Sequence, residues 1–391
     1  LPRKPREKRS VSRGGGHLGK DLNFALERTV TVLIIACPHA LGLAIPLVTA
    51  ISTSLAARNG LLVRQRIALE SARNIDVVLF DKTGTLTKGE HGVVDIWTMP
   101  NHSQEELLSL SSSVESESEH PIAQAIVESA KEKHIEILKA EQFTALPGRG
   151  AQAFVKGRLI TVGSPLLIKE KNLTLSDDLK NKIEQAGKQG KTVVYVLSDT
   201  EIIGAITTAD LIREESKDAV RNLNSLGIRV VMLTGDSIDV ASYVAKELDI
   251  KEYFAEVLPE HKVDKVKELQ KDGSKVAMVG DGVNDAPALT QADIGIAIGA
   301  GTDVAIESAG IILAKNDPRD VVKIFRLSKA TYSKMQQNLV WATGYNVLAI
   351  PLAAGVFGFV LPAAIGALLM SASTIIVALN AQWLRRFKMS N

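Results

Sequence analysis

The stretch that decides the fold is Val77-Val78-Leu79-Phe80-Asp81-Lys82-Thr83-Gly84-Thr85-Leu86-Thr87. Its four leading apolar residues predict a buried strand, and the polar, glycine-containing residues that follow predict a loop at its carboxyl end. An aspartate in such a loop can attack a phosphoryl group and become an aspartyl phosphate, and the loop amides can cradle the phosphate oxygens. A lone aspartate there would more simply be a turn residue, but the whole heptapeptide from Asp81 favours the nucleophile.

Two further apolar runs, 230–233 and 276–279, end in polar loops, Thr234-Gly235-Asp236 and Gly280-Asp281-Gly282. Short apolar runs that alternate with helical patterns predict a parallel α/β sheet. Because open parallel sheets bind ligands at the carboxyl ends of their strands, we expect the three loops to form one polar site. The stretch 98–206 has its own helical and strand patterns, and we expect it to be a separate, inserted domain.

The composition excludes several classes of protein. The chain has 391 residues, 46% of them hydrophobic, and its net charge of +2 argues against a nucleic-acid partner. Cys37 is the only cysteine, so an intrachain disulfide is impossible. No Asp, Glu, Lys or Arg occurs in 29–57 or in 335–384, whereas a membrane span needs about 20 apolar residues. We therefore predict transmembrane helices at 28–57, 336–355 and 361–384, because a buried core helix of this length usually carries a charge on a solvent face.

Positive charge beside the predicted spans gives their orientation. The flanking residues are Arg58, Arg64, Arg66, Lys329, Lys334, Arg385, Arg386 and Lys388. Since positive residues favour the cytoplasmic side, we expect a multi-pass protein of the cell (plasma) membrane whose large middle region is cytoplasmic. Residues 1–20 carry seven Lys or Arg and would lie outside, against that rule. They are expected to be a disordered or non-native basic arm, unless upstream spans are missing.

The segment 81–87 resembles the phosphorylation motif of P-type ATPases, which share the haloacid-dehalogenase-like fold. The resemblance implies an α/β haloacid-dehalogenase-like phosphorylation domain at 75–97 and 207–325. It also implies an inserted α+β nucleotide-binding domain at 98–206, together with transmembrane α-helices. Related phosphatases carry a second aspartate two positions after the nucleophile, where this chain has Thr83. That second aspartate is the phosphatases' general acid and base. Its absence slows hydrolysis of the phosphoenzyme, as a pump requires.

The same resemblance assigns roles at the other strand ends. Thr234, beside Gly235 and Asp236, is expected to hold the phosphoryl oxygens, and Lys262 to neutralise their charge. Taken alone, Lys262 would be a solvated surface residue, and the pair Asp281 and Asp285 would be helix-capping residues. The resemblance implies the following sets: catalytic Asp81, Lys82, Thr83, Thr234, Gly235, Asp236 and Lys262; and Mg²⁺ ligands Asp81, Thr83, Asp281 and Asp285, since Mg²⁺ prefers oxygen.

The inserted domain contains Ser118-Glu119-His120-Pro121, which is similar to a motif of the heavy-metal branch of P-type ATPases. There, His120 would contact the adenine of ATP and Glu115 would accept a hydrogen bond from its amine. Gly148 and Gly150 would let the nucleotide approach closely, because they lack side chains. The branch commonly has Gly-Asn where this chain has Gly163-Ser164, and the serine has a shorter reach.

The first predicted span contains Cys37-Pro38-His39. Proline removes a helix hydrogen bond, ionisable groups inside a span mark function, and thiolate and imidazole bind soft metals. The alternative is a buried cysteine with His39 bonded to a carbonyl at the kink. The pattern resembles the copper- and silver-exporting subgroup, as do the spacing of Asn338, Tyr345, Asn346 and Pro351 and the segment 370–374. The ligands implied for Cu⁺, Cu²⁺ or Ag⁺ are Cys37, His39, Tyr345, Asn346, Met370 and Ser373.

These motifs predict ATP-driven export of copper or silver ions by a lipid-embedded enzyme that uses ATP and Mg²⁺. The Thr-Gly-Glu motif of the family's actuator domain does not occur in the sequence. We therefore expect the chain to be the C-terminal part of a pump that needs an actuator-containing part for turnover. Two alternatives stay open: a membrane-anchored haloacid-dehalogenase-like phosphatase, and a non-transporting fragment that binds ATP or metal.

Overall fold

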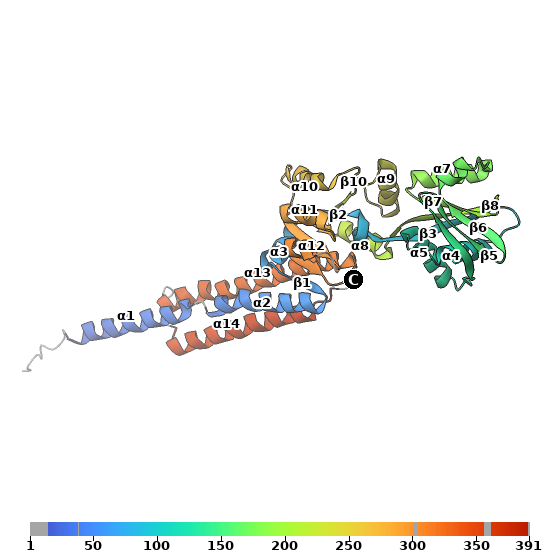
Figure 1. Ribbon diagram of the computed structural model, residues 1–391. Helices are drawn as coiled ribbons and strands as arrows, with labels where there is room; N and C mark the ends of the chain where they lie inside the picture. The colour runs from blue at the N-terminus through green and yellow to red at the C-terminus, as the bar shows by residue number, and fades with distance from the viewer. Residues whose placement is uncertain (1–14, 38, 300–302, 356–360, 390–391) are drawn as a thin grey trace, which may run out of the picture. The chain divides into compact units, whose positions relative to one another are not determined.

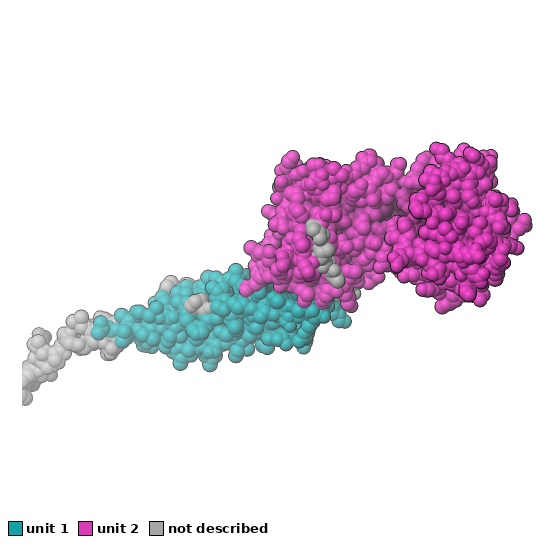
Figure 2. Space-filling model, in the orientation of Figure 1, with its two compact units in different colours: residues 1–59, 326–391 teal, residues 60–325 magenta. Residues whose placement is uncertain are grey.

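The computed structural model describes residues 15–37, 39–299, 303–355 and 361–389. It divides into two compact units (Figure 2), one made of Leu1–Asn59 with Arg326–Asn391 and the other of Gly60–Phe325. Most of the predicted basic arm and Pro38 lie outside the described residues, whereas residues 15–20 belong to a helix.

The unit Gly60–Phe325 contains two sheets (Figure 1). The first has the order β1-β13-β12-β11-β2-β9-β10, and its strands are parallel except for β1 against β13. Its strands are β1 (Leu61–Val63), β2 (Val77–Asp81), β9 (Arg229–Leu233), β10 (Glu252–Phe254), β11 (Val276–Gly280), β12 (Ile294–Ile298) and β13 (Ile311–Leu313). Its helices are α3 (Arg66–Ser71), α8 (Glu214–Ser225), α9 (Ile238–Glu247), α10 (Lys262–Gln270), α11 (Ala286–Gln291) and α12 (Asp303–Ser308). Residues 60–86 and 213–325, which form this sheet and its helices, are called the parallel-sheet lobe.

Strand β2 lies between β9 and β11. All residues of β2 and β11 are buried, as expected for strands of a parallel sheet that is covered on both faces. Leu79, Leu233 and Met278 belong to one apolar cluster with residues of α10 and α11. This core holds the ends of three strands at one edge of the sheet, and it confirms the predicted parallel α/β sheet.

The second sheet, in residues 87–212, is antiparallel throughout, with the order β3-β8-β7-β6-β5-β4. Its strands are β3 (Thr87–Thr98), β4 (Ala140–Leu146), β5 (Gly150–Val155), β6 (Arg158–Gly163), β7 (Thr192–Ser198) and β8 (Glu201–Ile212). Its helices are α4 (Gln104–Glu115), α5 (Pro121–Glu132), α6 (Pro165–Glu170) and α7 (Asp177–Lys188). We call this part the antiparallel-sheet lobe.

Both faces of the second sheet are covered. In β7, Val194 and Val196 pack with residues of α4 and α5, whereas Val193, Tyr195 and Leu197 pack with residues of α6 and α7. Successive side chains of a strand point to opposite faces, so an unbroken apolar run needs helices on both sides. The family resemblance implied such an inserted α+β domain, and the structure has one.

The second sheet starts earlier and ends later than the predicted insert, 98–206. Strand β3 pairs with β8 from Thr87 opposite Ile212 to Thr98 opposite Gly204. Residues 88–92, Lys-Gly-Glu-His-Gly, were not predicted to belong to the insert. In the structure these residues belong to a long two-stranded ribbon, in which 88–91 are exposed, and a register shift lies between Thr87 and His91.

The other unit consists of α1 (Gly15–Ala36), α2 (His39–Arg58), α14 (Ala363–Trp383) and most of α13 (Arg319–Ala354). The stretch 28–57, predicted as one span, is divided at Cys37 into α1 and α2. Among the described residues, two stretches are long and apolar enough to cross a membrane, Phe24–Arg58 and Ala363–Arg386. The predicted span 336–355 is not one of them. All of it except Gly355 lies in α13, and it has no charge but carries the polar amides Gln336, Gln337, Asn338 and Asn346.

Candidate active site and ion site

Three neighbouring strands place their polar loops at one edge of the parallel sheet. Asp81 ends β2, Thr234 follows β9, and Asp281 follows β11. Because these strands are adjacent and parallel, their carboxyl ends meet, as the sequence predicted. They line a cavity of about 580 Å³. The predicted residues that it brings together are Asp81, Thr83, Thr234, Gly235, Asp236, Lys262, Asp281 and Asp285.

A buried lysine lies at the centre of this cavity. Lys262 Nζ donates to Asp81 Oδ1 and to Asp285 Oδ1, each at 2.7 Å. Lys262 is the first residue of α10, which follows the turn at Pro259. Breaking such a buried ion pair on one side leaves an uncompensated charge, so the three groups depend on one another.

The carboxylates of the cavity crowd each other. Asp81, Asp281 and Asp285 each offer an oxygen, and these oxygens lie within 4.8 Å of one another. Burial, followed by the charge of Asp285, raises the pKa of Asp81 to about 7. Burial and Asp285 also raise the pKa of Asp281. The hard oxygen donors and the excess of negative charge fit a Mg²⁺ ion.

Burial alone would lower the pKa of Lys262, but the neighbouring Asp81 and Asp285 outweigh it, and the pKa of this lysine is raised. The ammonium therefore keeps its proton across the neutral range. It supplies fixed positive charge at the position where a carboxylate would accept a phosphoryl group.

One glycine is required by the loop that follows Asp81. Gly84 has φ +72°, and a Cβ atom there would lie 1.9 Å from Asp281 Oδ2. Any side chain at this position would push the loop away from Asp281. The glycine of the quoted stretch thus sets the spacing between the loop and an acidic side chain almost 200 residues further on.

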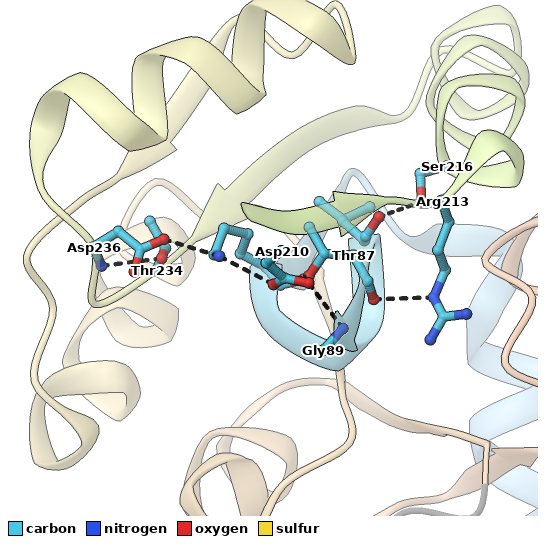
Figure 3. Close-up of polar contacts among 9 residues, drawn as sticks. Thr87, Gly89, Asp210, Arg213, Ser216, Thr234 and Asp236 are labelled. Carbon is cyan, nitrogen blue, oxygen red and sulfur yellow. Dashed lines mark hydrogen bonds and ion pairs between the residues drawn. The ribbon is translucent and has the colours of Figure 1, made fainter. Parts of the chain in front are cut away.

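Lys82 does not line this cavity. Its Nζ atom lies 2.9 Å from Asp236 Oδ2 and 3.3 Å from Asp210 Oδ2 (Figure 3). Of the predicted catalytic residues, Lys82 thus contacts Asp236, although it does not itself line the cavity. Asp210 was not predicted from the sequence, because it lies in a strand with no motif around it.

The predicted nucleotide residues meet in a second cavity of about 400 Å³ in the antiparallel-sheet lobe. Its lining includes Glu115, His120, Gly148, Gly150 and Ser164. His120 caps the first turn of α5, where its Nδ1 accepts from the backbone N–H of Ile122 at 3.3 Å. A hydrogen bond from Ser118 favours the ionised form of Glu115, but burial has the larger effect and raises its pKa to about 7.

The two glycines of this cavity are required for different reasons. Gly150 has φ +132°, and a Cβ atom there would lie 2.0 Å from the carbonyl oxygen of Val162. Gly148 has φ +71°, and a Cβ atom there would meet nothing within 4 Å. Gly150 is therefore required by strand packing and by its backbone conformation, and Gly148 by its backbone conformation alone.

In the helical unit, Cys37 Sγ and His39 Nδ1 lie 2.7 Å apart. The hydroxyl of Tyr345 in α13 donates to the carbonyl oxygen of Gly366 in α14 at 3.3 Å. Asn346 Oδ1 and Ser373 Oγ are buried and have no hydrogen-bond partner, and Met370 lies in α14. Among the described residues, no hydrogen bond joins the Cys37–His39 pair to the other predicted ligands.

An amide network in the same unit was not predicted as a site. The fully buried Asn338 donates from Nδ2 to the carbonyl oxygen of Ala44 at 3.4 Å and accepts at Oδ1 from Asn380 Nδ2 at 2.8 Å. Lys334 Nζ in turn donates to Asn380 Oδ1 at 2.9 Å. The network links α2, α13 and α14. The motif spacing pointed to Asn338, whereas nothing local marks Asn380.

Comparison with known proteins identifies the class. Residues 75–293 match the sequence model of the haloacid dehalogenase-like hydrolases, and residues 262–325 match a second one with the same description. The chain belongs to this family. Its relatives also confirm the resemblance to P-type ATPases, and the chain is a homologue of those enzymes.

Three relatives illustrate the similarity. A copper-exporting P-type ATPase B of Archaeoglobus fulgidus is 56% identical over 93% of this chain and 52% of its own length. A probable copper-transporting P-type ATPase B of Staphylococcus aureus is 49% identical over 92% of this chain and 54% of its own length. A copper-exporting P-type ATPase B of Enterococcus hirae is 44% identical over 93% and 49%, respectively. The chain spans about half the length of these relatives.

Two solved structures are similar over large parts of the chain. A zinc-transporting PIB-type ATPase in the E2.Pi state matches with a TM-score of 0.79 and 32% identity, over 97% of this chain and 65% of that one. The catalytic domain of a CPx-ATPase, described for its conformational changes upon nucleotide binding, matches with a TM-score of 0.50 and 31% identity. That match covers 71% of this chain and 98% of the other.

Proposed function

We propose that the chain forms the catalytic and ion-binding half of an ATP-driven pump that exports copper or silver ions through an aspartyl phosphate at Asp81. The observation that carries the proposal is the buried triad in which Lys262 bridges Asp81 and Asp285. The copper transporters among the relatives support the choice of cargo.

In the proposed reaction, a carboxylate oxygen of Asp81 attacks the γ-phosphorus of ATP. The bond from that phosphorus to the β–γ bridging oxygen breaks, and ADP leaves with the electron pair. Lys262 and the hydroxyl of Thr234 cover the phosphoryl oxygens as charge shifts onto the leaving group. A bound Mg²⁺, held by Asp81, Thr83, Asp281 and Asp285, would supply further positive charge.

Thr83 favours a pump over a phosphatase. It lines the cavity beside Asp81, at the position where related phosphatases carry their acid and base. A threonine hydroxyl does not ionise near neutral pH, so it cannot activate water against the acyl phosphate. The phosphoenzyme should therefore persist long enough to drive a conformational change.

For the nucleotide, we propose the cavity of the antiparallel-sheet lobe. Imidazole can stack on a base, the carboxylate of Glu115 can accept from the adenine amine, and the backbone at Gly148 and Gly150 leaves room for close approach. All four residues line the same cavity, which supports the assignment.

For the transported ion, we propose Cys37 and His39 with ligands from α13 and α14. Thiolate and thioether suit Cu⁺ or Ag⁺, and imidazole also suits Cu²⁺. The buried, unpartnered oxygens of Asn346 and Ser373 support the proposal, since buried polar atoms rarely lack a partner. With Tyr345 and Met370 they complete the proposed ligand set. On this proposal, residues 336–355 form a third span, and the unit Gly60–Phe325 is cytoplasmic at the cell membrane.

The test is ATP-dependent labelling of the chain in lipid nanodiscs. With γ-labelled ATP and Mg²⁺, we expect an acid-stable, hydroxylamine-sensitive label on the wild-type chain and none on Asp81→Asn. The label should also respond to Ag⁺ in the wild-type chain and lose this response in Cys37→Ser/His39→Ala.

Three results would count against the proposal. Equal labelling of Asp81→Asn would show that Asp81 is not the nucleophile. Rapid release of phosphate with no trapped label would favour the phosphatase. An Ag⁺ response that survives in Cys37→Ser/His39→Ala would show that the ion does not bind at these two residues. It would not contradict the proposed phosphorylation of Asp81.

A further inference from the structure

Arg28 is a charged residue that is buried inside the helical unit. It lies in α1, directly before the stretch 29–57, which contains no Asp, Glu, Lys or Arg. The exposed fraction of Arg28 is only 7%, whereas its neighbour Glu27 is exposed. An arginine at the end of a membrane span usually extends its charge to water. A buried one is costly and marks a functional group.

The guanidinium of Arg28 binds the ends of two other helices. Its Nη1 atom donates to the carbonyl oxygen of Ala353 at 3.3 Å and to that of Leu361 at 3.1 Å. Ala353 lies in the last turn of α13, where carbonyl groups have no partner within the helix, and Leu361 lies just before α14. One side chain of α1 thus ties α13 to α14 at the end of the unit where α13 ends and α14 begins. We call this end the far end.

An apolar layer lies between Arg28 and the candidate ion site. Cys37 is nine residues after Arg28, which corresponds to a helical rise of about 14 Å. The buried members of the layer are Ile35, Ala349, Ala353 and Leu361. Tyr345, a proposed ion ligand, packs against them. Since a dry apolar constriction is a barrier to an ion, this layer closes the site toward the far end.

Alpha-helices α1 and α14 are in close contact within this layer. A Cβ atom at Gly366 in α14 would lie 3.0 Å from Ile35 Cδ1 in α1. Ile35 itself has no exposed surface. There is therefore no open path between these two helices while Arg28 holds their far ends together.

Part of the guanidinium of Arg28 makes no hydrogen bond. Its Nε and Nη2 atoms are buried and have no hydrogen-bond partner, although Nη2 lies 3.2 Å from Glu27 Oε1. Buried donors without a partner cost free energy. The arrangement is thus held by the bonds to Ala353 and Leu361 but weakened by the unpartnered donors, which suits a contact that has to open.

We infer that Arg28 and the carbonyl groups of Ala353 and Leu361 form a latch that keeps the ion site closed toward the far end. The inference rests on the proposed function, in which the unit Gly60–Phe325 is cytoplasmic and the ion leaves toward the far end. While the latch is closed, both the apolar layer and the positive charge of Arg28 oppose the passage of a cation. Release of the ion requires the two carbonyl bonds to break so that the far ends separate.

The test uses Cys37, the only cysteine of the chain, as a reporter of access. Inside-out and right-side-out lipid vesicles present the two sides to a membrane-impermeant, positively charged thiol reagent, in the absence of ATP. Methionine at position 28 keeps an apolar stem and removes both donated bonds. From the far-end side, we expect Cys37 to react at least tenfold faster in Arg28→Met than in the wild-type chain. From the cytoplasmic side, its rate should stay within twofold.

Glu27→Gln is the matched control, because it removes the charge beside Nη2 and leaves both carbonyl bonds in place. We expect its rates from both sides to stay within twofold of wild type. Arg28→Lys keeps a cation that can donate to a carbonyl group, so it should restore most of the protection. This variant also guards against a first variant that fails to fold.

Two results would overturn the inference. Unchanged reactivity from the far-end side in Arg28→Met would show that Arg28 closes nothing. An equal rise from both sides would show that the whole helical unit has loosened. If the wild-type chain acquired no label from ATP, the proposed function would fail, whereas the rates of Cys37 would still report the latch.

Discussion

The two lobes of the unit Gly60–Phe325 carry their candidate sites in different ways. The cavity of the parallel-sheet lobe gathers Asp81, Asp281, Asp285 and Lys262 in a nearly buried cluster. The cavity of the antiparallel-sheet lobe is lined mainly by apolar side chains and glycines, with Glu115 as its one buried carboxyl group. A transferring phosphoryl group is best recognised by charge, and a flat base by shape and a few hydrogen bonds. Substitutions in the first cavity should therefore act through charge, and those in the second through space.

The largest effect should come from Lys262→Met. This change leaves Asp81 and Asp285 buried without the cation that both contact at 2.7 Å. Their mutual repulsion raises the pKa of Asp81 further, so less of it is an ionised nucleophile at neutral pH, and the phosphoryl oxygens lose their cover. We expect the rate of labelling from ATP to fall about 100-fold or more, as when a donor to a developing charge is removed.

Lys265→Met provides the control for this change. Lys265 lies on the same helix, is more exposed, and pairs with Glu268 at 2.8 Å. Its loss should leave labelling within twofold of wild type, and both variants should bind ATP normally. A Lys262→Met chain that labels at the wild-type rate would show that phosphoryl transfer does not take place in the cavity of the parallel-sheet lobe.

A smaller effect, on ATP affinity, is expected in the cavity of the antiparallel-sheet lobe, where Gly150→Ala is compared with Gly148→Ala. A Cβ atom at Gly150 would lie 2.0 Å from the carbonyl oxygen of Val162, so β5 and β6 must move apart. At Gly148 the space is open, and alanine meets only the cost of a left-handed backbone, about 1 kcal/mol. By calorimetry, we expect ATP affinity to fall about tenfold for Gly150→Ala and less than threefold for Gly148→Ala. Equal losses would mean that backbone conformation, rather than space, governs this cavity.

The same contrast explains what the sequence could predict. The residues around Asp81, Thr234 and Asp281 were found because each follows an apolar strand, and adjacent parallel strands bring their ends together. The glycines Gly148 and Gly150 were found through a local motif. These predictions needed only short patterns and one rule of sheet geometry.

The features that were missed depend on contacts between distant residues. Asp210 binds Thr87 across 123 positions and has no local signature. Strand β3 was not predicted, because its polar residues are stabilised by pairing with β8 rather than by burial. Lys82 and Asp81 are adjacent in the motif, but Asp81 ends β2 and Lys82 begins the turn that follows, so their side chains reach different partners. The partners of Lys82 are Asp210 in β8 and Asp236 in the loop after β9.

The smallest effect, and the one that sharpens the comparison most, concerns Glu115, the single buried carboxyl group in the cavity of the antiparallel-sheet lobe. Burial raises the pKa of Glu115 to about 7 from an ordinary value of 4.5. Its ionised fraction therefore rises from roughly a tenth at pH 6 to roughly nine-tenths at pH 8. An ionised carboxylate accepts a hydrogen bond from an amine more strongly than a neutral carboxyl group does, so wild-type ATP affinity should increase with pH over this range, by about threefold.

Glu115→Gln keeps an acceptor that does not titrate, and the ATP affinity of this variant should be flat from pH 6 to pH 8. Calorimetric titrations of both chains on the Asp81→Asn background, where no phosphoryl transfer interferes, would measure the difference. If affinity fell with pH, or if the glutamine variant kept the slope, Glu115 would not be the group that reads the adenine amine.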